Sequence, residues 1–267
     1  MSNLHSNDSW NRGDPYELYV GRWSRLIADQ FLTWLGMPSS LHWLDVGCGT
    51  GALTAAIVEK CRPNRVFGIE PSEGFLAKAR ERLHDTATLH VAHALDIPIE
   101  DSSIDVVVSG LVLNFIPSPS EGLSQMRRKA KVGGTIAAYV WDYAKRMELI
   151  RHFWDAAVKL NPEAHALDEG VRFPLCQQSA LEDAFQHTGL TDVKSTPIEI
   201  TTHFRDFDDY WTPFLGGQGP APSYVSSLDE GSRGKLRDHI RERLPIQPNG
   251  SITLVARAWA VRGKVPA

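Results

Sequence analysis

The chain has 267 residues, of which 42% are hydrophobic and 22% charged, and its formal net charge is -4. This composition is ordinary for a globular protein, and the acidic balance disfavours nucleic acid as a partner because phosphate backbones attract basic proteins. No apolar run is long enough to span a bilayer, and the polar N-terminus lacks the apolar core of a signal peptide. The three cysteines, Cys48, Cys61 and Cys176, indicate neither a disulfide framework nor a metal site. We therefore expect a cytoplasmic protein without membrane insertion.

The first half of the chain alternates short apolar runs with helical patterns. Residues 1–15 look like a loose tail, and the apolar spacing in 24–35 predicts a helix. Strands are then expected at 42–46, 65–70, 88–92, 104–109 and 134–141, with helices at 52–60, from 72 onward, and at 120–130. Strands that alternate with helices predict a parallel sheet covered on both faces, as in Rossmann-like doubly wound α/β folds.

The pattern changes after Trp141. We expect a helix at 147–160, a loop carrying Arg172, Phe173 and Pro174, an outer helix at 179–187 and a strand at 193–202. The insertion that follows has one helical face marked by Leu236, Ile240 and Leu244, and a last strand is expected at 251–261. Segments 144–175 and 204–249 both follow strand ends, so they are expected over the edge where open α/β sheets bind ligands.

These expectations divide the chain into six parts. They are a tail and lid helix (1–36), a cofactor-binding core (37–143), a first cap insertion (144–175), a continuation of the core (176–203), a second cap insertion (204–249) and a final core strand (250–267).

A glycine-rich turn, LDVGCGTGA at residues 44–52, follows the first predicted strand. Its Gly47-x-Gly49-x-x-Ala52 spacing fits the dinucleotide fingerprint. Its Asp45-x-Gly47-x-Gly49-x-Gly51 spacing fits a turn that holds S-adenosylmethionine. A carboxylate at Asp45 would face an anionic pyrophosphate unfavourably but suits the ammonium group of S-adenosylmethionine, which favours the second interpretation.

Glu70 closes the second predicted strand, where a carboxylate can accept hydrogen bonds from both ribose hydroxyls of either cofactor. Alternatively, it is a solvated acid at a strand end.

Four stretches in register carry a family resemblance. They are WLDVGCGTG (43–51), GIEPSEGFLAKAR (68–80), ALDIPIEDSSIDVVVSGLVLNFIP (94–117) and KVGGTIAAYVWD (131–142). With them the chain resembles the class I S-adenosylmethionine-dependent methyltransferases, and it is similar to the ubiquinone/menaquinone-biosynthesis-type small-molecule enzymes. The resemblance covers about 100 residues. It implies a seven-stranded sheet with an antiparallel last strand and S-adenosyl-L-methionine as cofactor.

The resemblance also assigns cofactor contacts. Asp45, Gly47, Gly49 and Gly51 belong to the turn at the amino-acid end, and Glu70 holds the ribose. Pro71, Ser72, Ala94 and Leu95 border the adenine, and Ser109 and Leu111 lie beneath the cofactor. His93 stands where the family often has an acid that accepts a bond from the adenine amino group, and it is either such a contact or a surface-loop histidine. Tyr19, Arg22 and Trp23 are lid candidates, or Trp23 simply docks an N-terminal helix.

Two side chains are candidates for catalysis. Asp142 follows the fifth predicted strand and is either a base or polar-group ligand, or a helix cap or ion-pair partner. Asn114 follows the fourth strand and either faces the substrate or bonds its own turn. Its NFIP context departs in spacing from the Asn-Pro-Pro-aromatic motif of nucleic-acid and protein amino methylation.

Aromatic residues are dense in both insertions and could wall an apolar pocket, or they could pack the cap against the sheet. The substrate-binding candidates are Trp141, Tyr143, Trp154, Arg172, Phe173, Tyr210, Trp211 and Phe214. Arg172 is either an anchor for a carboxylate or a surface ion-pair residue.

We therefore expect transfer of a methyl group from S-adenosylmethionine to a small, apolar or aromatic molecule, by in-line displacement aided by positioning. The alternatives are a catalytically silent S-adenosylmethionine-binding domain that acts through a protein partner, and a nicotinamide dehydrogenase, which Asp45 disfavours. No metal is expected, and the chain is expected to be a monomer or a homodimer.

Overall fold

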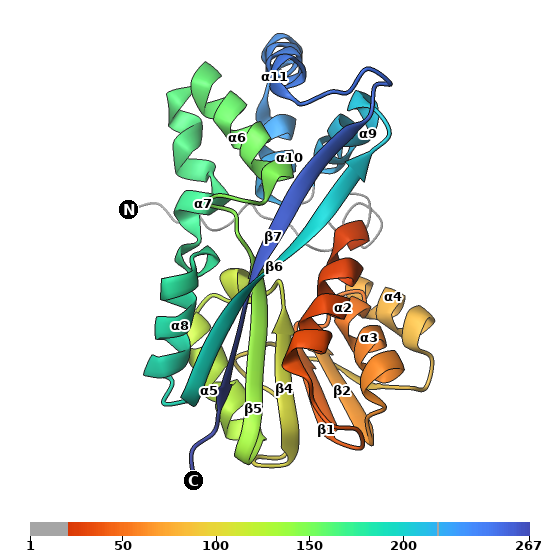
Figure 1. Cartoon of the computed structure of the whole chain (residues 1–267), viewed down its shortest axis with the longest axis vertical. Coiled ribbons are helices and arrows are strands. Elements are labelled where there is room, and N and C mark those ends of the chain that lie inside the picture. The colour runs from red at the N-terminus through yellow and green to blue at the C-terminus, as the bar shows by residue number, and fades with distance from the viewer. Residues whose placement is uncertain (1–20, 218) are drawn as a thin grey trace. The chain divides into compact units, whose positions relative to one another are not determined.

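The structure is a computed structural model that describes residues 21–217 and 219–267 (Figure 1). The described residues fall into two compact units. Unit 1 contains residues 21–23, 142–173 and 199–257, apart from residue 218, and unit 2 contains residues 24–141, 174–198 and 258–267. The two predicted cap insertions fall largely within unit 1.

The strands form one seven-stranded sheet in the order β3-β2-β1-β4-β5-β7-β6. They are β1 (His42–Val46), β2 (Arg65–Glu70), β3 (Thr88–Val91), β4 (Ile104–Gly110), β5 (Ala130–Trp141), β6 (Thr191–Phe204) and β7 (Ile252–Lys264). The pairs among β1 to β5 are parallel, whereas β7 runs antiparallel to β5. This confirms the predicted fold class, including its antiparallel last strand.

Helices cover both faces of the sheet in unit 2. They are α2 (Arg22–Leu35), which begins in unit 1, α3 (Ala52–Cys61), α4 (Glu73–Leu83), α5 (Pro119–Lys129) and α8 (Gln178–His187), with short 3-10 turns η2 (Leu113–Phe115) and η4 (Pro174–Cys176). Leu44 packs in one core with Leu123 of α5 and Phe185 of α8. On the other face Phe31 of α2 lies 4.7 Å from the ring of Tyr139 on β5. Figure 1 shows α5 and α8 on one side of these strands and α2 and α3 on the other.

Burial on both faces explains why β1 reads as a continuous apolar run in the sequence. All four residues from Trp43 to Val46 are buried, and Asp45 is the one among them with a charged side chain. A charged side chain in a central strand needs a specific reason, because burying it is costly unless it is paired.

Unit 1 contains the remaining helices. They are α6 (Glu148–Leu160), η3 (Pro162–Leu167), α7 (Glu169–Arg172), α9 (Phe207–Trp211), η5 (Thr212–Gly216), α10 (Pro220–Ser227) and α11 (Glu230–Arg243). The expectation of a loop after residue 160 was wrong, because η3 and α7 lie there. Asn161 and Asp168 cap these turns by accepting bonds from the N–H groups of Glu163 and Gly170. Both turns are too short to show a helical period.

Three strands differ from prediction by two or more residues at one end or both. β5 begins at Ala130 rather than 134, because a register shift beside β4 and a positive φ of 73° at Gly133 let the strand accommodate its two glycines. β6 and β7 are both longer than predicted. Along the chain, β6 continues from unit 2 into unit 1, and β7 continues from unit 1 into unit 2. Within the described part of the chain, no helix combines the length and apolar character needed to cross a membrane.

Candidate functional site

The glycine turn joins β1 to α3 and is held by backbone bonds. The N–H groups of Gly47 and Cys48 both donate to the carbonyl of Ile69, each at 2.9 Å. Gly47 has a φ of 76°, and a Cβ there would lie only 2.6 Å from Cγ1 of Val112. A Cβ on Gly49, also at positive φ, would meet nothing within 4 Å. The turn is therefore closed on the Val112 side and open at Gly49, where a ligand can approach the backbone.

Asp45 supplies a buried carboxylate immediately before this turn. Its Oδ2 accepts a bond from the hydroxyl of Thr54 on α3 at 2.7 Å, whereas its buried Oδ1 has no hydrogen-bond partner within the described residues. Burial raises the pKa of Asp45 from 3.8 to about 7, against the opposing effect of Thr54, and the charge of Glu70 adds to the rise. A cationic group at Oδ1 would complete the site and favour the charged form.

Glu70, at the end of β2, braces the turn from the neighbouring strand. Its carboxylate accepts the N–H of Gly49 at 3.2 Å and the N–H of Ser72 at 3.0 Å. Burial raises the pKa of Glu70, and these two bonds oppose the rise. Each oxygen has one of these donors, so each retains a lone pair for a further donor such as a hydroxyl group.

The predicted adenine border lies on the loops after β2 and β3. Ser72 caps α4 by accepting the N–H of Phe75 at 3.3 Å, and Pro71 is exposed. The side chain of His93 is exposed, and its carbonyl accepts the N–H of Asp96 at 3.0 Å. Ala94 and Leu95 are partly buried against the core of unit 2. The structure thus places these residues on the loops that follow two neighbouring strands, β2 and β3.

The end of β4 carries the other predicted residues of unit 2. The hydroxyl of Ser109 donates to the carbonyl of Val46 at 2.9 Å, which ties β4 to β1 beside the turn. Leu111 has a φ of 64°, a conformation that leucine seldom adopts, and its N–H donates to the carbonyl of Tyr139 at 2.7 Å. Asn114, in η2, has a buried Oδ1 that finds no hydrogen-bond partner in the described part of the chain.

Asp142 is the first residue of unit 1 after β5, and its two oxygens differ in their contacts. Oδ1 accepts the N–H of Lys145 at 3.0 Å. Oδ2 is buried and lies 3.5 Å from Nη1 of Arg257, without a hydrogen-bond partner among the described residues. Burial raises the pKa of Asp142, and these neighbours oppose the rise. The structure therefore gives Asp142 the cap and ion-pair contacts that were the alternative to a catalytic role, and the catalytic role stays a prediction.

The predicted substrate-binding aromatics are buried, Trp141 within β5 and the others in unit 1. Phe214 stacks on Phe153 with ring centroids 4.7 Å apart, and the hydroxyl of Tyr210 donates to the carbonyl of Leu149 at 2.9 Å. Trp211 lies 6.0 Å from Phe214. These contacts make Tyr210, Trp211 and Phe214 part of the core of unit 1, and their contact with a substrate stays a prediction.

The lid candidates begin at the edge of the described residues, and Tyr19 lies outside them. Arg22 forms an ion pair of 3.1 Å with Asp209 and lies over the rings of Trp23 and Phe204, 4.5 and 4.8 Å from their centroids. The observed contacts of Arg22 and Trp23 are therefore within unit 1, and a cofactor contact for either stays a prediction.

Sequence reasoning missed a polar cluster in unit 1 built by Arg151, Asp168 and Glu169. Arg151 binds both oxygens of Asp168 at 2.7 Å each, and the indole N–H of Trp154 donates to Glu169. Asp168 and Glu169 are buried. The short Asp-Glu-Gly sequence at 168–170 is a cap signal that could have located the turn, but nothing in the sequence pairs it with Arg151.

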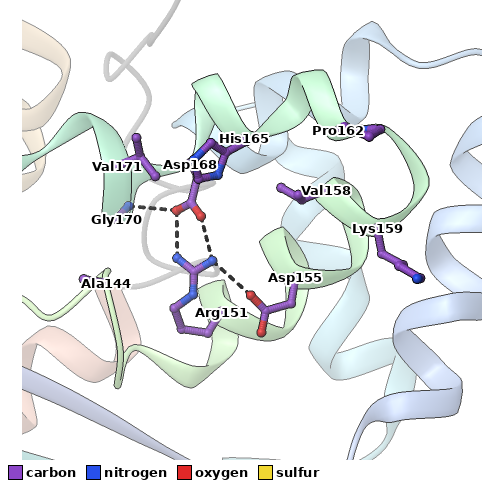
Figure 2. A pocket seen from close by; sticks show the side chains of 10 residues that line it. All are labelled: Ala144, Arg151, Asp155, Val158, Lys159, Pro162, His165, Asp168, Gly170 and Val171. Carbon is purple, nitrogen blue, oxygen red and sulfur yellow. Dashed lines mark hydrogen bonds and ion pairs between the residues drawn. The ribbon is translucent and has the colours of Figure 1, made fainter.

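Arg151 and Asp168 of this cluster line a cavity of about 730 Å³ in unit 1, which Figure 2 shows. Its walls come from α6, η3, the start of α7 and Ala144. The lining residues are Ala144, Arg151, Asp155, Val158, Lys159, Pro162, His165, Asp168, Gly170 and Val171. Among the residues that the structure describes, no group of three or more histidine, cysteine or acidic side chains is placed to hold a metal ion.

Comparison with known proteins points to one family. Residues 44–138 match a family model described as a methyltransferase domain. The chain is 36% identical over 121 residues to a demethylmenaquinone methyltransferase of Symbiobacterium thermophilum, and the match covers 43% of this chain and 48% of that protein. The chain therefore spans about half the length of this relative.

Solved structures share the fold at low identity. Phosphoethanolamine N-methyltransferase 2 of Haemonchus contortus, in complex with phosphomonomethylethanolamine and S-adenosylhomocysteine, superimposes with a TM-score of 0.60 at 15% identity over 95% of this chain and 58% of that one. The [4+2]-cyclase SpnF superimposes with a TM-score of 0.56 at 12% identity over 98% of this chain and 89% of that one. Because one neighbour is a cyclase, this structural similarity shows the fold only, and the reaction has to be inferred from the residues of the site.

Proposed function

We propose that this chain transfers a methyl group from S-adenosylmethionine to a small molecule that is apolar or aromatic, a proposal that the match of residues 44–138 to a methyltransferase domain supports. The observation that carries the proposal is Oδ1 of Asp45, a buried carboxylate oxygen that lacks a partner among the described residues and lies beside the glycine turn.

The residues of the turn fit this cofactor. Oδ1 of Asp45 suits the ammonium group of the amino-acid end, and the open side of Gly49 leaves room for the chain of the cofactor. Glu70 has lone pairs free to accept the two ribose hydroxyls. A pyrophosphate at the turn would instead meet the carboxylate of Asp45, so this residue argues against a nicotinamide cofactor. Pro71, Ser72, His93, Ala94, Leu95, Ser109 and Leu111 are proposed as the remaining contacts.

When bound, S-adenosylmethionine supplies a methyl carbon that is already activated by the positively charged sulfur. The task left to the protein is to align the acceptor and to exclude water. Asn114 and Asp142 are the two catalytic candidates. Oδ1 of Asn114 and Oδ2 of Asp142 are both buried without a hydrogen-bond partner in the described residues, so each can accept a bond from an acceptor hydroxyl or amine. Oδ2 of Asp142 would share that role with its ion pair to Arg257.

The nature of the acceptor is proposed from two observations. The relative from Symbiobacterium thermophilum is named for methylation of demethylmenaquinone, a small molecule. The predicted substrate residues are mostly aromatic, and they include Tyr143 and Phe173, whose rings lie 5.9 Å apart. Arg172 lies over the ring of Phe173 at 5.2 Å. We assign recognition of the acceptor to side chains of unit 1.

Calorimetric titration with S-adenosylhomocysteine tests the cofactor, with NADH as the control ligand. Binding of S-adenosylhomocysteine alone is expected, and binding of NADH alone would refute the proposal. Methyl transfer is then assayed by mass spectrometry with 1,4-naphthohydroquinone, catechol and an aliphatic amine. A methylated hydroquinone or catechol is expected. Cofactor binding without any methylated product would favour the silent domain that acts through a protein partner.

A further inference from the structure

Arg151 connects three segments of unit 1 through one guanidinium group. From the middle of α6, its two terminal nitrogens bind the two oxygens of Asp168 at 2.7 Å each. Nη1 also donates to the carbonyl of Tyr143 at 2.9 Å. The side chains of Arg151 and Asp168 are only 15% and 6% exposed. Figure 2 shows this fork among the side chains that line the cavity, with Asp155 as a further, more exposed partner.

Asp168 in turn fixes the backbone that follows it. Its Oδ1 accepts the N–H of Gly170 at 2.8 Å, and its carbonyl accepts the N–H groups of Val171 and Arg172 at 3.0 and 2.9 Å. The N–H of Phe173 donates to the carbonyl of Glu169 at 3.0 Å. Segment 168–173 is therefore a single hydrogen-bonded turn whose first side chain is held by Arg151.

The turn also packs too closely for any side chain at Gly170. A Cβ there would lie 2.9 Å from Cα of Ala144, from the carbonyl of Tyr143 and from Nη1 of Arg151. On its other side, Glu169 accepts the indole N–H of Trp154, which stands one turn after Arg151 on α6. Two contacts, Arg151–Asp168 and Trp154–Glu169, thus attach neighbouring residues of the turn to the same helix.

We propose that Arg151 is a positioning residue of the acceptor site, which holds Tyr143, Trp154, Arg172 and Phe173 in one arrangement without touching the acceptor. The inference rests on the proposed function, because these four are its predicted acceptor contacts. Arginine is required because its planar fork binds both oxygens of Asp168 and still reaches the carbonyl of Tyr143. A lysine at this position is a point charge that cannot make all three bonds together.

The structural half of the proposal is tested without any substrate. The indole N–H resonance of Trp154, assigned with W154F, and amide hydrogen exchange at 171–173 are compared in the unsubstituted chain and in R151K. R151K is expected to shift the indole resonance and to speed the exchange by about tenfold or more. R237K is the matched control, because it makes the same arginine-to-lysine change at the exposed Arg237–Asp208 pair. It is expected to leave the two signals unchanged.

The functional half is tested with the acceptor found above. R151K and the nearly isosteric D168N, which serves if R151K folds poorly, are expected to raise KM for the acceptor by about tenfold or more. The Kd for S-adenosylhomocysteine is expected to stay unchanged. An unmoved indole resonance in both variants would overturn the positioning role, whatever the activity. A moved resonance with an unchanged KM would show that the turn does not serve the acceptor, and would also overturn it.

Different measurements would refute the two proposals. If the unsubstituted chain binds S-adenosylhomocysteine but methylates nothing in the panel, the proposed function fails before any variant is made, and the positioning role falls with it. If the unsubstituted chain methylates an acceptor and the variants behave like it, only the positioning role fails.

Discussion

Replacing Asp45 by asparagine should weaken cofactor binding. It should also raise the free energy of unfolding of the protein without bound cofactor. The charged carboxylate of Asp45 is buried, and one of its oxygens has no partner among the described residues. Such a group costs stability until a cation binds. Asparagine keeps the size of the side chain and removes the charge.

The size of the effect follows from the pKa of Asp45. A rise from 3.8 to about 7 makes the charged form unfavourable by about 4 kcal/mol, at about 1.36 kcal/mol per pH unit. Between these two values the folded state binds more protons than the unfolded state, so stability falls as the pH rises and the full cost is present above pH 7. D45N should therefore raise the free energy of unfolding by about 2–4 kcal/mol at pH 8, and by less than half of that at pH 5.

Binding of S-adenosylhomocysteine has the opposite dependence, because its ammonium group needs the charged carboxylate. For the unsubstituted protein, Kd should rise about 25-fold between pH 7.5 and pH 5.5 as Asp45 becomes protonated. At pH 7.5 D45N should bind at least about tenfold more weakly, since a hydrogen bond to a charged group is lost, and its Kd should hardly change with pH.

Chemical denaturation and calorimetry across this pH range measure both quantities. D105N is the matched control, because Asp105 lies on the same sheet but is bound by Lys131 and by the N–H of His42. A Kd for the unsubstituted protein that does not change with pH, or a D45N variant that binds as tightly, would refute the assignment of Oδ1 to the ammonium group.

Three further substitutions test the site and the core. G47A should lower the free energy of unfolding by about 2–4 kcal/mol and abolish S-adenosylhomocysteine binding, because its Cβ meets Val112 at positive φ. G133A, at a similar φ with nothing within 4 Å of its Cβ, should cost only about 1–2 kcal/mol in the same denaturation assay, and equal losses would contradict this account. E70Q should raise the Kd for S-adenosylhomocysteine in calorimetry about tenfold, because the two ends of an amide cannot both accept the Gly49 and Ser72 N–H groups. The control E73Q, at an exposed residue, should leave this Kd unchanged. Y210F should lower the free energy of unfolding by about 1 kcal/mol, because the hydrogen bond to Leu149 is lost. It should leave the Kd for S-adenosylhomocysteine unchanged, and a changed Kd would mean that Tyr210 serves the cofactor site.

The sheet was predictable because its physical causes are local in the sequence. Strands buried on both faces are rich in apolar residues, and the observed bounds of β1 and β2 match the predicted 42–46 and 65–70. The position of the glycine turn was equally predictable, because a close backbone approach and a positive φ both favour glycine. In both cases a short window of sequence contains everything that decides the structure.

The contacts of unit 1 were not predictable in this way. Arg151 and Asp168 are 17 residues apart, and their pairing depends on the chain reversal through η3, whose turns are too short to have a period. Asp142 illustrates a second limit. Its partner Arg257 comes from β7, so the sequence could name the two possible roles of the carboxylate but not the ion pair that it forms.

The aromatic residues of the second insertion illustrate a third limit. A dense aromatic run reads the same whether it lines a pocket or fills a core, because both need large apolar surfaces. Only the contacts separate the two, such as the bond that commits the Tyr210 hydroxyl to a backbone carbonyl.

The strand order has a consequence for synthesis of the protein. β7 pairs with β5 and lies between β5 and β6 in the sheet, although it is the last of the seven strands in the sequence. On the ribosome, β6 therefore has no neighbour to join until residues 252–264 have emerged. Long-range pairing of this kind is slow, and it leaves strand edges open meanwhile. The β5 and β6 edges would be the natural binding points for chaperones during translation.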